Sequence, residues 1–189
     1  MIFDRKGSTA IAVVFVLGFS IAMTALAKRQ DGSAKQAATA AASRSTPEMD
    51  RLKFYLGEWD YTETYPKGAK NTGLYTSKLG PGGNSLINTF HSQGPAGESE
   101  GMLVYTWDAT EKCYKAYVFG GDFPGALVET GQFEGDDLVF RAEISMGGTT
   151  MKLRNTTHLV EAGKLVSDEF AARKDGAEAL IVHVEARKR

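Results

Sequence analysis

From residue 58 onward, about ten short segments in which apolar and polar residues alternate follow one another, separated by turns rich in glycine, proline and aspartate. Side chains of a β-strand point alternately to its two faces, so this pattern predicts strands with one buried and one solvated face. In one such segment, Phe140, Ala142 and Ile144 alternate with charged and hydroxyl side chains. The predicted strands span residues 58–65, 72–79, 84–93, 99–107, 112–119, 126–134, 137–146, 149–159, 164–173 and 178–187.

The connections between these segments determine their arrangement. Most are about two to five residues long, which makes consecutive strands antiparallel neighbours in an up-and-down order. An open sheet would leave two unpaired edges and need a covering layer, but only residues 47–56 predict a helix, of one to two turns, ended by Gly57. A two-sheet sandwich, the alternative, normally needs longer Greek-key connections. We therefore expect an all-β protein with a single up-and-down antiparallel β-barrel of about ten strands and a short N-terminal helix.

The N-terminal part predicts export. Arg5 and Lys6 precede an apolar stretch over residues 10–27 that ends in Ala-Leu-Ala, so residues 1–27 are predicted to be a signal peptide. A retained membrane anchor is the alternative. Residues 28–47 contain no aromatic residue and predict a flexible linker. This linker is either a soluble spacer or, through its basic residues, a weak contact with an anionic membrane. We expect a periplasmic or secreted protein, membrane-tethered if the signal is uncleaved, with no other membrane domain.

Residues 48–189 are predicted to form the one folded domain, the barrel. Acidic and basic residues are mixed along it, without the basic stripe that nucleic-acid binding requires, so no nucleic-acid partner is expected. Cys113 is the only cysteine, which excludes an internal disulfide. We expect it to be buried as a small apolar side chain, with stability supplied by the core and the hydrogen-bonded sheet.

Several short motifs carry a family resemblance. They are Pro-Glu-Met-x-Arg-Leu at 47–52, Leu-Gly-Glu-Trp-Asp at 56–60, Gly-Pro-Gly-Gly at 80–83, Thr-Trp-Asp at 106–108 and Gly-x-Phe-x-Gly-Asp at 131–136. With these motifs, the chain resembles the exported bacterial "domain of unknown function 1579" family and, more distantly, the lipocalins, fatty-acid-binding proteins and nitrobindin-like barrels of the calycin superfamily. The resemblance implies a barrel with no assigned activity, in which Trp59 packs across the closed end as a structural plug.

Patterns that would indicate catalysis or a bound cofactor are weak. The chain has no Gly-x-Ser-x-Gly motif and no closely spaced histidine pair, so we expect neither an enzyme nor a metal site. Nitrobindin-like barrels bind haem through a histidine near the end of the chain, and His183 lies in a loosely similar His-x-x-Ala context. If Leu180, Val182 and Val184 face inward, as strict alternation predicts, His183 faces solvent. No cofactor is expected, with haem on His183 as the alternative.

The interior of the barrel is the remaining place for a function. A barrel of about ten strands is wide enough to hold a small molecule, so we expect non-catalytic binding of a small hydrophobic ligand. The alternative is that the same side chains fill the interior and leave a structural or protein-interaction module. The candidate ligand-binding residues are apolar side chains on the predicted strands: Phe90, Met102, Val104, Phe140, Ile144, Met146, Met151 and Leu153.

Overall fold

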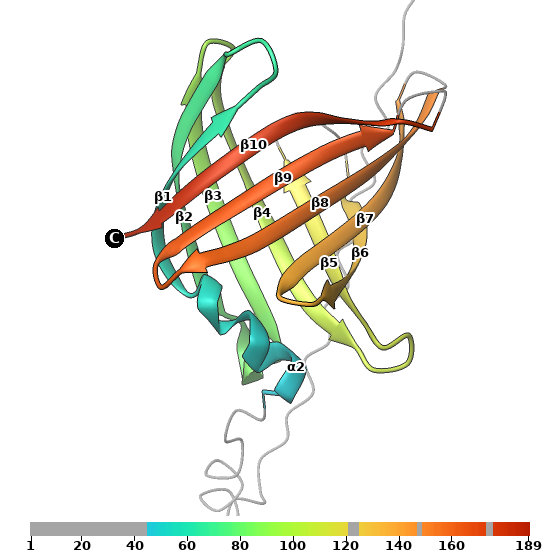
Figure 1. Cartoon of the computed structure of the whole chain (residues 1–189). Helices are drawn as coiled ribbons and strands as arrows, with labels where there is room; N and C mark the ends of the chain where they lie inside the picture. Colours follow the sequence, from blue (N-terminus) through green and yellow to red (C-terminus); the bar gives the residue numbers. More distant parts are fainter. Residues whose placement is uncertain (1–44, 121–124, 147–148, 173–175) are drawn as a thin grey trace, which may run out of the picture. The chain divides into compact units, whose positions relative to one another are not determined.

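The computed structural model of the chain describes residues 45–120, 125–146, 149–172 and 176–189 (Figure 1). The predicted signal peptide and most of the predicted linker lie outside these residues. Ten antiparallel strands form a closed barrel in the order β1-β10-β9-β8-β7-β6-β5-β4-β3-β2. The predicted fold, with its up-and-down order and its short helix, is therefore confirmed.

The elements follow the predicted segments closely. The helical part consists of the α-helix α2 (Pro47–Asp50) and the 3-10 helix η1 (Arg51–Tyr55), and a further 3-10 turn, η2 (Pro81–Gly83), precedes the third strand. No helix of the described residues is long and apolar enough to cross a membrane. The strands are β1 (Gly57–Thr64), β2 (Lys70–Leu79), β3 (Ser85–Gly94), β4 (Gly97–Asp108), β5 (Cys113–Gly120), β6 (Leu127–Glu134), β7 (Asp137–Met146), β8 (Thr149–Glu161), β9 (Lys164–Ala172) and β10 (Glu178–Lys188).

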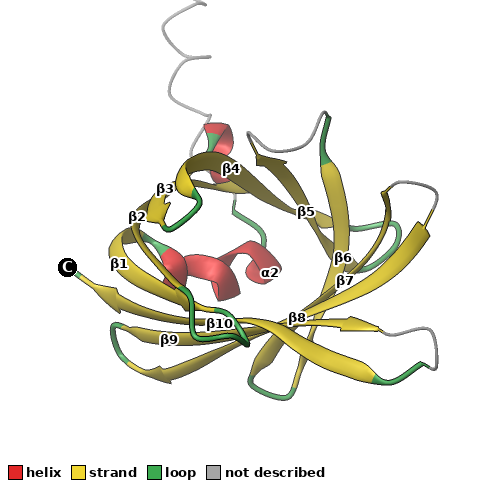
Figure 2. Ribbon diagram, turned by 90° about the horizontal axis from the view of Figure 1, so that it is seen from above, coloured by secondary structure: helices red, strands yellow, loops and turns green. Residues whose placement is uncertain are grey.

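The short helical segment lies across one end of the barrel, and the ring of strands surrounds it in the view from above (Figures 1 and 2). The Thr46 hydroxyl accepts a hydrogen bond from the Met49 amide at 3.3 Å and caps the first turn. At the other end of the segment, Gly57 has φ +113°, a conformation that favours glycine and turns the chain into β1. The Tyr114 hydroxyl donates to the Glu48 carbonyl at 2.8 Å and so ties the helix to β5.

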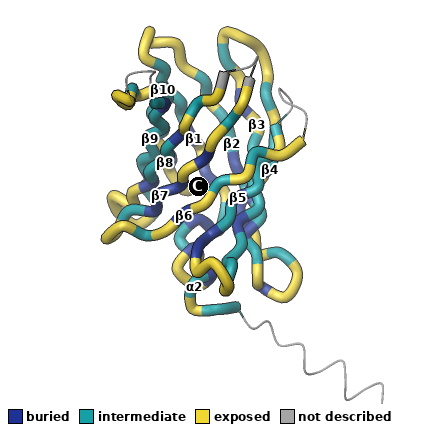
Figure 3. Tube along the Cα trace, turned by 90° about the vertical axis from the view of Figure 1, so that its right-hand side faces the viewer, coloured by how far each residue is buried: buried dark blue, intermediate teal, exposed yellow. Residues whose placement is uncertain are grey.

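Trp59 lies at this helix end of the barrel. Its side chain is fully buried, and its indole Nε1 donates to the Tyr55 carbonyl oxygen at 2.7 Å. The ring stacks on Tyr75 with centroids 5.7 Å apart. Met49 and Leu52 from the helical segment are also buried, in the same core cluster as Trp59. Figure 3 shows buried stretches, in dark blue, on the strands next to α2. The helix end is thus filled by side chains, as a tapering barrel end requires.

Three aromatic side chains of the interior sit opposite glycines on neighbouring strands. Phe140 pairs with Gly131, and a Cβ placed on that glycine would lie 2.5 Å from the Phe140 ring. Phe90 is placed in the same way over Gly101. Tyr61 also lies over a glycine of β2. Glycine lets each ring lie against the backbone of the next strand, so the ring lines the barrel wall instead of crossing the interior.

A β-bulge in β10 changes the predicted phase of that strand. The pairing with β9 shifts between Leu180 and Val182, so one extra residue is inserted there. Leu180, which strict alternation places inside, is 41% exposed, whereas Ile181 packs against buried side chains. The prediction for Leu180 was wrong because a bulge reverses the facing of every residue before it.

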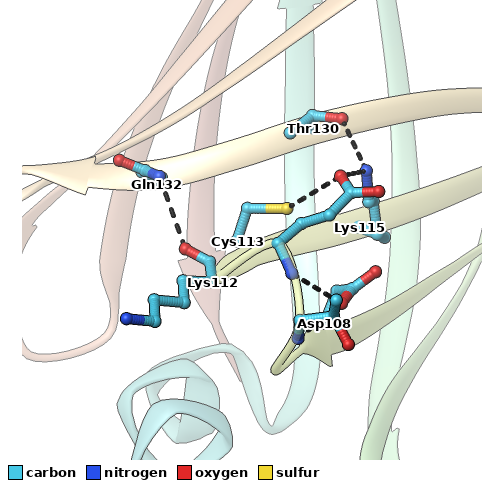
Figure 4. Close-up of polar contacts among 8 residues, drawn as sticks. Asp108, Lys112, Cys113, Lys115, Thr130 and Gln132 are labelled. Carbon is cyan, nitrogen blue, oxygen red and sulfur yellow. Dashed lines mark hydrogen bonds and ion pairs between the residues drawn. The ribbon is translucent and has the colours of Figure 1, made fainter.

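The turn between β4 and β5 leads directly into the single cysteine, Cys113 (Figure 4). The Asp108 carboxylate accepts hydrogen bonds from the Thr110 and Glu111 amides at 2.9 and 3.0 Å and holds the turn. Cys113 follows at the start of β5 and is buried, as predicted. Burial raises the pKa of its thiol. The thiol therefore stays protonated and is a weak nucleophile.

Candidate ligand-binding cavity

The barrel contains a cavity of about 360 Å³. Side chains from η1 and from all ten strands line it, so no single segment of the sequence defines it. It begins near Tyr55 at the helix end and extends to Glu63 and Tyr65, at the opposite end of β1. Its volume lies within the range of about 300–1,000 Å³ that is usual for small-molecule sites.

Only part of the predicted set lines this cavity. Phe90 and Phe140 do so. Met102 and Val104 do not, because their neighbours Leu103 and Tyr105 on β4 face the cavity and side chains alternate along a strand. Met102 instead borders a groove that also includes the exposed Phe119. The prediction was wrong at these two positions because this stretch of β4 is apolar on both faces and its phase cannot be read from hydrophobicity.

Three further predicted residues lie in a second cluster. Ile144, Met151 and Leu153 pack with the buried residues Ala142 and Ala171 and do not line the cavity. This cluster lies near the barrel end opposite the helix, where β7 ends and β8 begins. The packing of these three side chains agrees with the prediction that they face inward. It does not agree with the prediction that they line the ligand site. The side chain of Met146 lies outside the described part of the chain.

Tyrosines form much of the wall of the cavity. The Tyr55 and Tyr105 rings stack with centroids 5.7 Å apart, and Tyr105 is tilted against Phe140 at 5.6 Å. Tyr61 and Tyr75 form a second pair at 5.9 Å. Burial raises the pKa of Tyr55 and of Tyr61 to about 12, so both phenols are neutral near pH 7. The wall therefore offers ring faces and neutral hydroxyl groups.

Sequence reasoning missed these tyrosines because it selected only apolar side chains. A signal was present, since Trp59 and Tyr61 share one phase of β1 and a buried tryptophan marks the inward face. The same applies to Tyr105, which follows Leu103 by two residues on β4.

Carboxylates from three strands also line the cavity. Glu63 accepts hydrogen bonds from the Tyr65 hydroxyl at 2.9 Å and from the Asn71 amide at 3.0 Å. Glu129 and Glu169, in contrast, have no hydrogen-bond or ion-pair partner among the described residues. Burial raises the pKa of Glu129 to about 7, and the negative charge of Glu169 contributes to that rise. Burial also raises the pKa of Glu169, with a further contribution from Glu63.

The glutamates were also missed, although their positions follow strand phase. Glu129 shares its phase on β6 with Leu127 and Phe133, which are both packed against core clusters. Glu169 shares its phase on β9 with Leu165, which is buried. An acid at an inward position is the signal that a search for apolar residues passes over.

Two asparagines reach the cavity and differ in their hydrogen bonding. Asn155 Oδ1 accepts from the Ser167 hydroxyl at 3.0 Å. Asn88 lines the cavity and is only 7% exposed, yet its Oδ1 atom has no hydrogen-bond partner among the described residues. A buried acceptor without a donor is unfavourable by about 1–3 kcal/mol.

None of the three histidines lines the cavity. His183 Nδ1 lies 2.7 Å from Asp168 Oδ1, and His158 Nδ1 lies 2.6 Å from Asp137 Oδ1. His91 borders a groove that extends over β10, β1, β2 and β3, and it lies 3.8 Å from the Glu98 carboxylate. Within the described residues, no three His, Cys, Asp or Glu side chains are grouped so that they could hold a metal ion.

Comparisons with known proteins bear on the fold. No protein-family model matches the chain, and no curated protein matches its sequence. Among solved structures, the crystal structure of Rv2717c from M. tuberculosis is similar, with a TM-score of 0.50 and 12% identity over 77% of this chain and 99% of that chain. Two designed proteins also align. A de novo designed fluorescence-activating β-barrel has a TM-score of 0.43 and 13% identity over 74% of this chain and 98% of that chain. The redesigned β-barrel mFAP0 bound to DFHBI has a TM-score of 0.42 and 10% identity over 71% of this chain and 99% of that chain. At these identities the similarity to Rv2717c shows a shared β-barrel fold and nothing finer.

Proposed function

We propose that this protein binds a small, largely apolar molecule inside its barrel and does not transform it. The observation that supports this function is the cavity of about 360 Å³, which is lined by side chains of all ten strands and walled in large part by aromatic rings. Rings that line a preformed cavity bind an apolar molecule without a large rearrangement of the protein. The interior is not filled by side chains, which disfavours the alternative of a structural barrel with a filled core.

The hydroxyl groups of Tyr55, Tyr61 and Ser167 in the cavity support binding over catalysis. Burial raises the pKa values of Tyr55 and Tyr61, whereas a nucleophile needs a lowered pKa or an adjacent base. The Ser167 hydroxyl bonds to the Thr157 hydroxyl and the Asn155 amide oxygen, neither of which is a base. The haem alternative is disfavoured because His183 is bonded to Asp168 away from the cavity.

We also propose that the protein is exported and related to the domain of unknown function 1579 family. The basic and apolar pattern of residues 1–27 supports export, and the motifs between residues 47 and 136 support the relationship. Fractionation of the source cells with an antibody against residues 48–189 would test the location. Finding the protein only in the cytoplasm would contradict it.

A pair of variants on one strand tests binding in the cavity. Leu103 lines the cavity and its neighbour Val104 does not, so Leu103→Trp fills the cavity while Val104→Trp adds the same ring to the other face of β4. Calorimetric titration with naphthalen-1-ylmethanol, a neutral two-ring probe, would measure the affinity. We expect Leu103→Trp to weaken binding at least about tenfold and Val104→Trp to leave it unchanged.

Native mass spectrometry of the purified protein provides a second, independent readout, since a retained natural ligand adds its mass to the chain. Failure of the wild-type protein to bind the neutral probe or any related two-ring compound, together with a bare mass, would contradict the proposed function. Equal effects of the two tryptophan substitutions would show that the probe binds elsewhere.

A further inference from the structure

We infer that the cavity selects ligands with a positively charged head group, such as an organic ammonium ion attached to an apolar body. This inference rests on the proposed function and adds the chemical class of the ligand. Three features of the described residues support it: unpaired carboxylates inside the barrel, a buried acceptor without a donor, and a wall of tyrosine rings.

The charge of the cavity is entirely negative. Glu63, Glu129 and Glu169 reach it from β1, β6 and β9, and no Lys, Arg or His is among its described lining residues. Tyr65 and Asn71 satisfy Glu63, but Glu129 and Glu169 have no partner in the described chain. Burying an unpaired carboxylate is unfavourable, and a cation in the cavity would remove that penalty. An anionic ligand would instead meet like charges.

Asn88 provides an observation that does not depend on the acids. The residue is buried, with 7% of its surface exposed, it lines the cavity, and its Oδ1 has no donor among the described residues. An ammonium group carries N–H donors and no acceptor, so it is the kind of head group that can satisfy an unpaired amide oxygen of a lining residue as well as the carboxylates. A neutral hydrocarbon would leave the amide oxygen unpaired.

The tyrosine wall suits the same head group. Faces of aromatic rings attract cations within about 6 Å of the ring centre, and the attraction is stronger in a desolvated site than at an exposed one. Tyr55, Tyr75 and Tyr105 are buried and line the cavity. Burial raises the pKa of each of these tyrosines and keeps its hydroxyl neutral near pH 7, so they add no competing charge. The rings can therefore contact both the apolar body and the cationic head.

Binding of a cation is expected to depend on pH. The titratable groups that face Glu129 across the cavity are Glu63, Glu169, Tyr55, Tyr61, Tyr65, Tyr75 and Tyr105. Glu129, with a pKa of about 7, changes charge near neutral pH, whereas burial keeps Tyr55 and Tyr61 neutral there. Glu129 is neutral below its pKa and negative above it, so the affinity for a cation should rise as the pH increases through about 7. A bound cation should also lower the pKa of Glu129 and release a proton.

Three probes with the same two-ring body separate charge from apolar contact. Naphthalen-1-ylmethylamine is a cation at neutral pH, naphthalen-1-ylmethanol is neutral, and naphthalene-1-carboxylate is an anion. Calorimetric titration of the full chain at about pH 8 should show the amine binding at least about tenfold more tightly than the alcohol, because hydrogen bonds to charged groups are stronger than those between neutral groups. The carboxylate should bind most weakly. Titration in two buffers of different ionisation enthalpy should show proton release with the amine near neutral pH and none with the alcohol.

A pair of variants assigns the preference to the cavity. Glu129→Gln keeps the shape of the side chain and removes its charge. Glu134→Gln removes an exposed carboxylate of the same strand, one that pairs with Arg141. We expect Glu129→Gln to lose most of the preference for the amine and its pH dependence but to retain binding of the alcohol. Glu134→Gln should behave like the wild type.

The outcomes of the two proposals are distinguishable. The inference of a cationic ligand would be overturned by equal affinities for the amine and the alcohol. It would also be overturned by an amine preference that is the same in the wild type and in Glu129→Gln. Either result would leave the cavity as a site for neutral molecules. Failure of all three probes to bind would overturn the proposed function itself. An amine preference that Glu134→Gln reduces as strongly as Glu129→Gln would assign it to general surface charge and also overturn the inference.

Discussion

Trp59 and Glu129 both place a polar group inside the barrel, but only Trp59 gives that group a partner. The indole N–H of Trp59 donates to the Tyr55 carbonyl, so its burial adds apolar contact without an unsatisfied donor. The Glu129 carboxylate faces the cavity without a partner among the described residues, and its pKa rises as a result. The buried and hydrogen-bonded Trp59 stabilises the fold. The unpaired Glu129 carboxylate is unfavourable when it is charged, and a cationic ligand would remove that penalty.

Replacement of Trp59 tests the first arrangement. Trp59→Phe removes the hydrogen bond, leaves the Tyr55 carbonyl without its donor and opens a small space, so the free energy of unfolding should fall by about 1–3 kcal/mol. Urea denaturation followed by circular dichroism would measure it. Trp107, the other tryptophan, is only partly buried, so Trp107→Phe is the matched control and should lose less. A larger loss for Trp107→Phe would contradict this role of Trp59.

Glu129 should make the stability of the unliganded protein depend on pH. Its pKa rises from 4.5 to about 7 on folding, so between these pH values the folded chain holds a proton that the unfolded chain releases. This contribution to stability is complete below pH 4.5 and is lost as the pH rises through about 7. At about pH 8, Glu129→Gln should therefore be more stable than the wild type by on the order of 2 kcal/mol. At pH 4.5 the two should be nearly equal.

The difference between the two proteins is the informative quantity, because exposed acids act in the opposite direction. Hydrogen bonds to Arg189 and Arg154 lower the pKa values of Asp60 and Glu178, so their contributions are lost as the pH falls. These groups are shared by the wild type and the variant and cancel in the comparison. Equal stability of the two proteins at the higher pH would show that Glu129 is solvated and not buried.

Contacts between neighbouring strands determine how much of the barrel interior is left unfilled. The rings of Phe90 and Phe140 lie over glycines on the adjacent strands, which lets them line the wall. The bulge in β10 also affects which side chains line the cavity. Leu180, before the bulge, faces outward, whereas Val182 and Val184, after it, face the cavity. Local departures from regular strands thus shape the binding site.

A side chain at Gly131 should close part of this space. Gly131→Val would place atoms within 2.5 Å of the Phe140 ring and push the ring into the cavity. We expect the free energy of unfolding to fall by about 1–3 kcal/mol, as for other overpacked cores, and the affinity for naphthalen-1-ylmethanol to fall with it. Gln132→Val, at the exposed neighbouring position, is the control and should change neither quantity. Unchanged binding by Gly131→Val would show that the cavity tolerates a displaced Phe140.

The whole barrel depends on contact between the two ends of the described sheet. β1 pairs with β10, and beyond this pairing the Arg189 amide donates to the Glu58 carbonyl at 3.0 Å while its guanidinium binds Asp60 through two nitrogens. This closure brings together strands that lie far apart in the sequence and leaves neither strand with a free edge. The cavity exists only once the ring is complete.

Removal of the last strand tests the importance of closure. A chain that ends at residue 177 lacks β10 and exposes the edges of β1 and β9. We expect it to lose cooperative unfolding and to self-associate, as measured by thermal denaturation and size-exclusion chromatography. A chain that lacks only Arg189 retains the strand pairing and should remain folded. A monomeric and cooperatively folding chain without β10 would contradict the requirement for closure.

The sequence alone was sufficient to predict the strands, their order and the barrel. Side-chain alternation and turn residues act over a few neighbours, so they can be read locally, and short connections leave few topologies open. The same reasoning placed Phe90 and Phe140 on the inner face. It was wrong for Met102 and Val104, where both faces of β4 are apolar, and for Leu180, where a bulge reverses the phase.

Only the tertiary structure decided what kind of cavity the barrel encloses. Ile144, Met151 and Leu153 lie in a separate cluster because inward-facing residues on different strands meet according to the register and tilt of the closed ring, which no local pattern contains. The same closure brings Glu129, Glu169 and Asn88 into one space with the tyrosines. The alternation of apolar and polar residues in the sequence thus determined that the chain forms a barrel. Closure of the barrel determined that its cavity is lined by aromatic and acidic side chains.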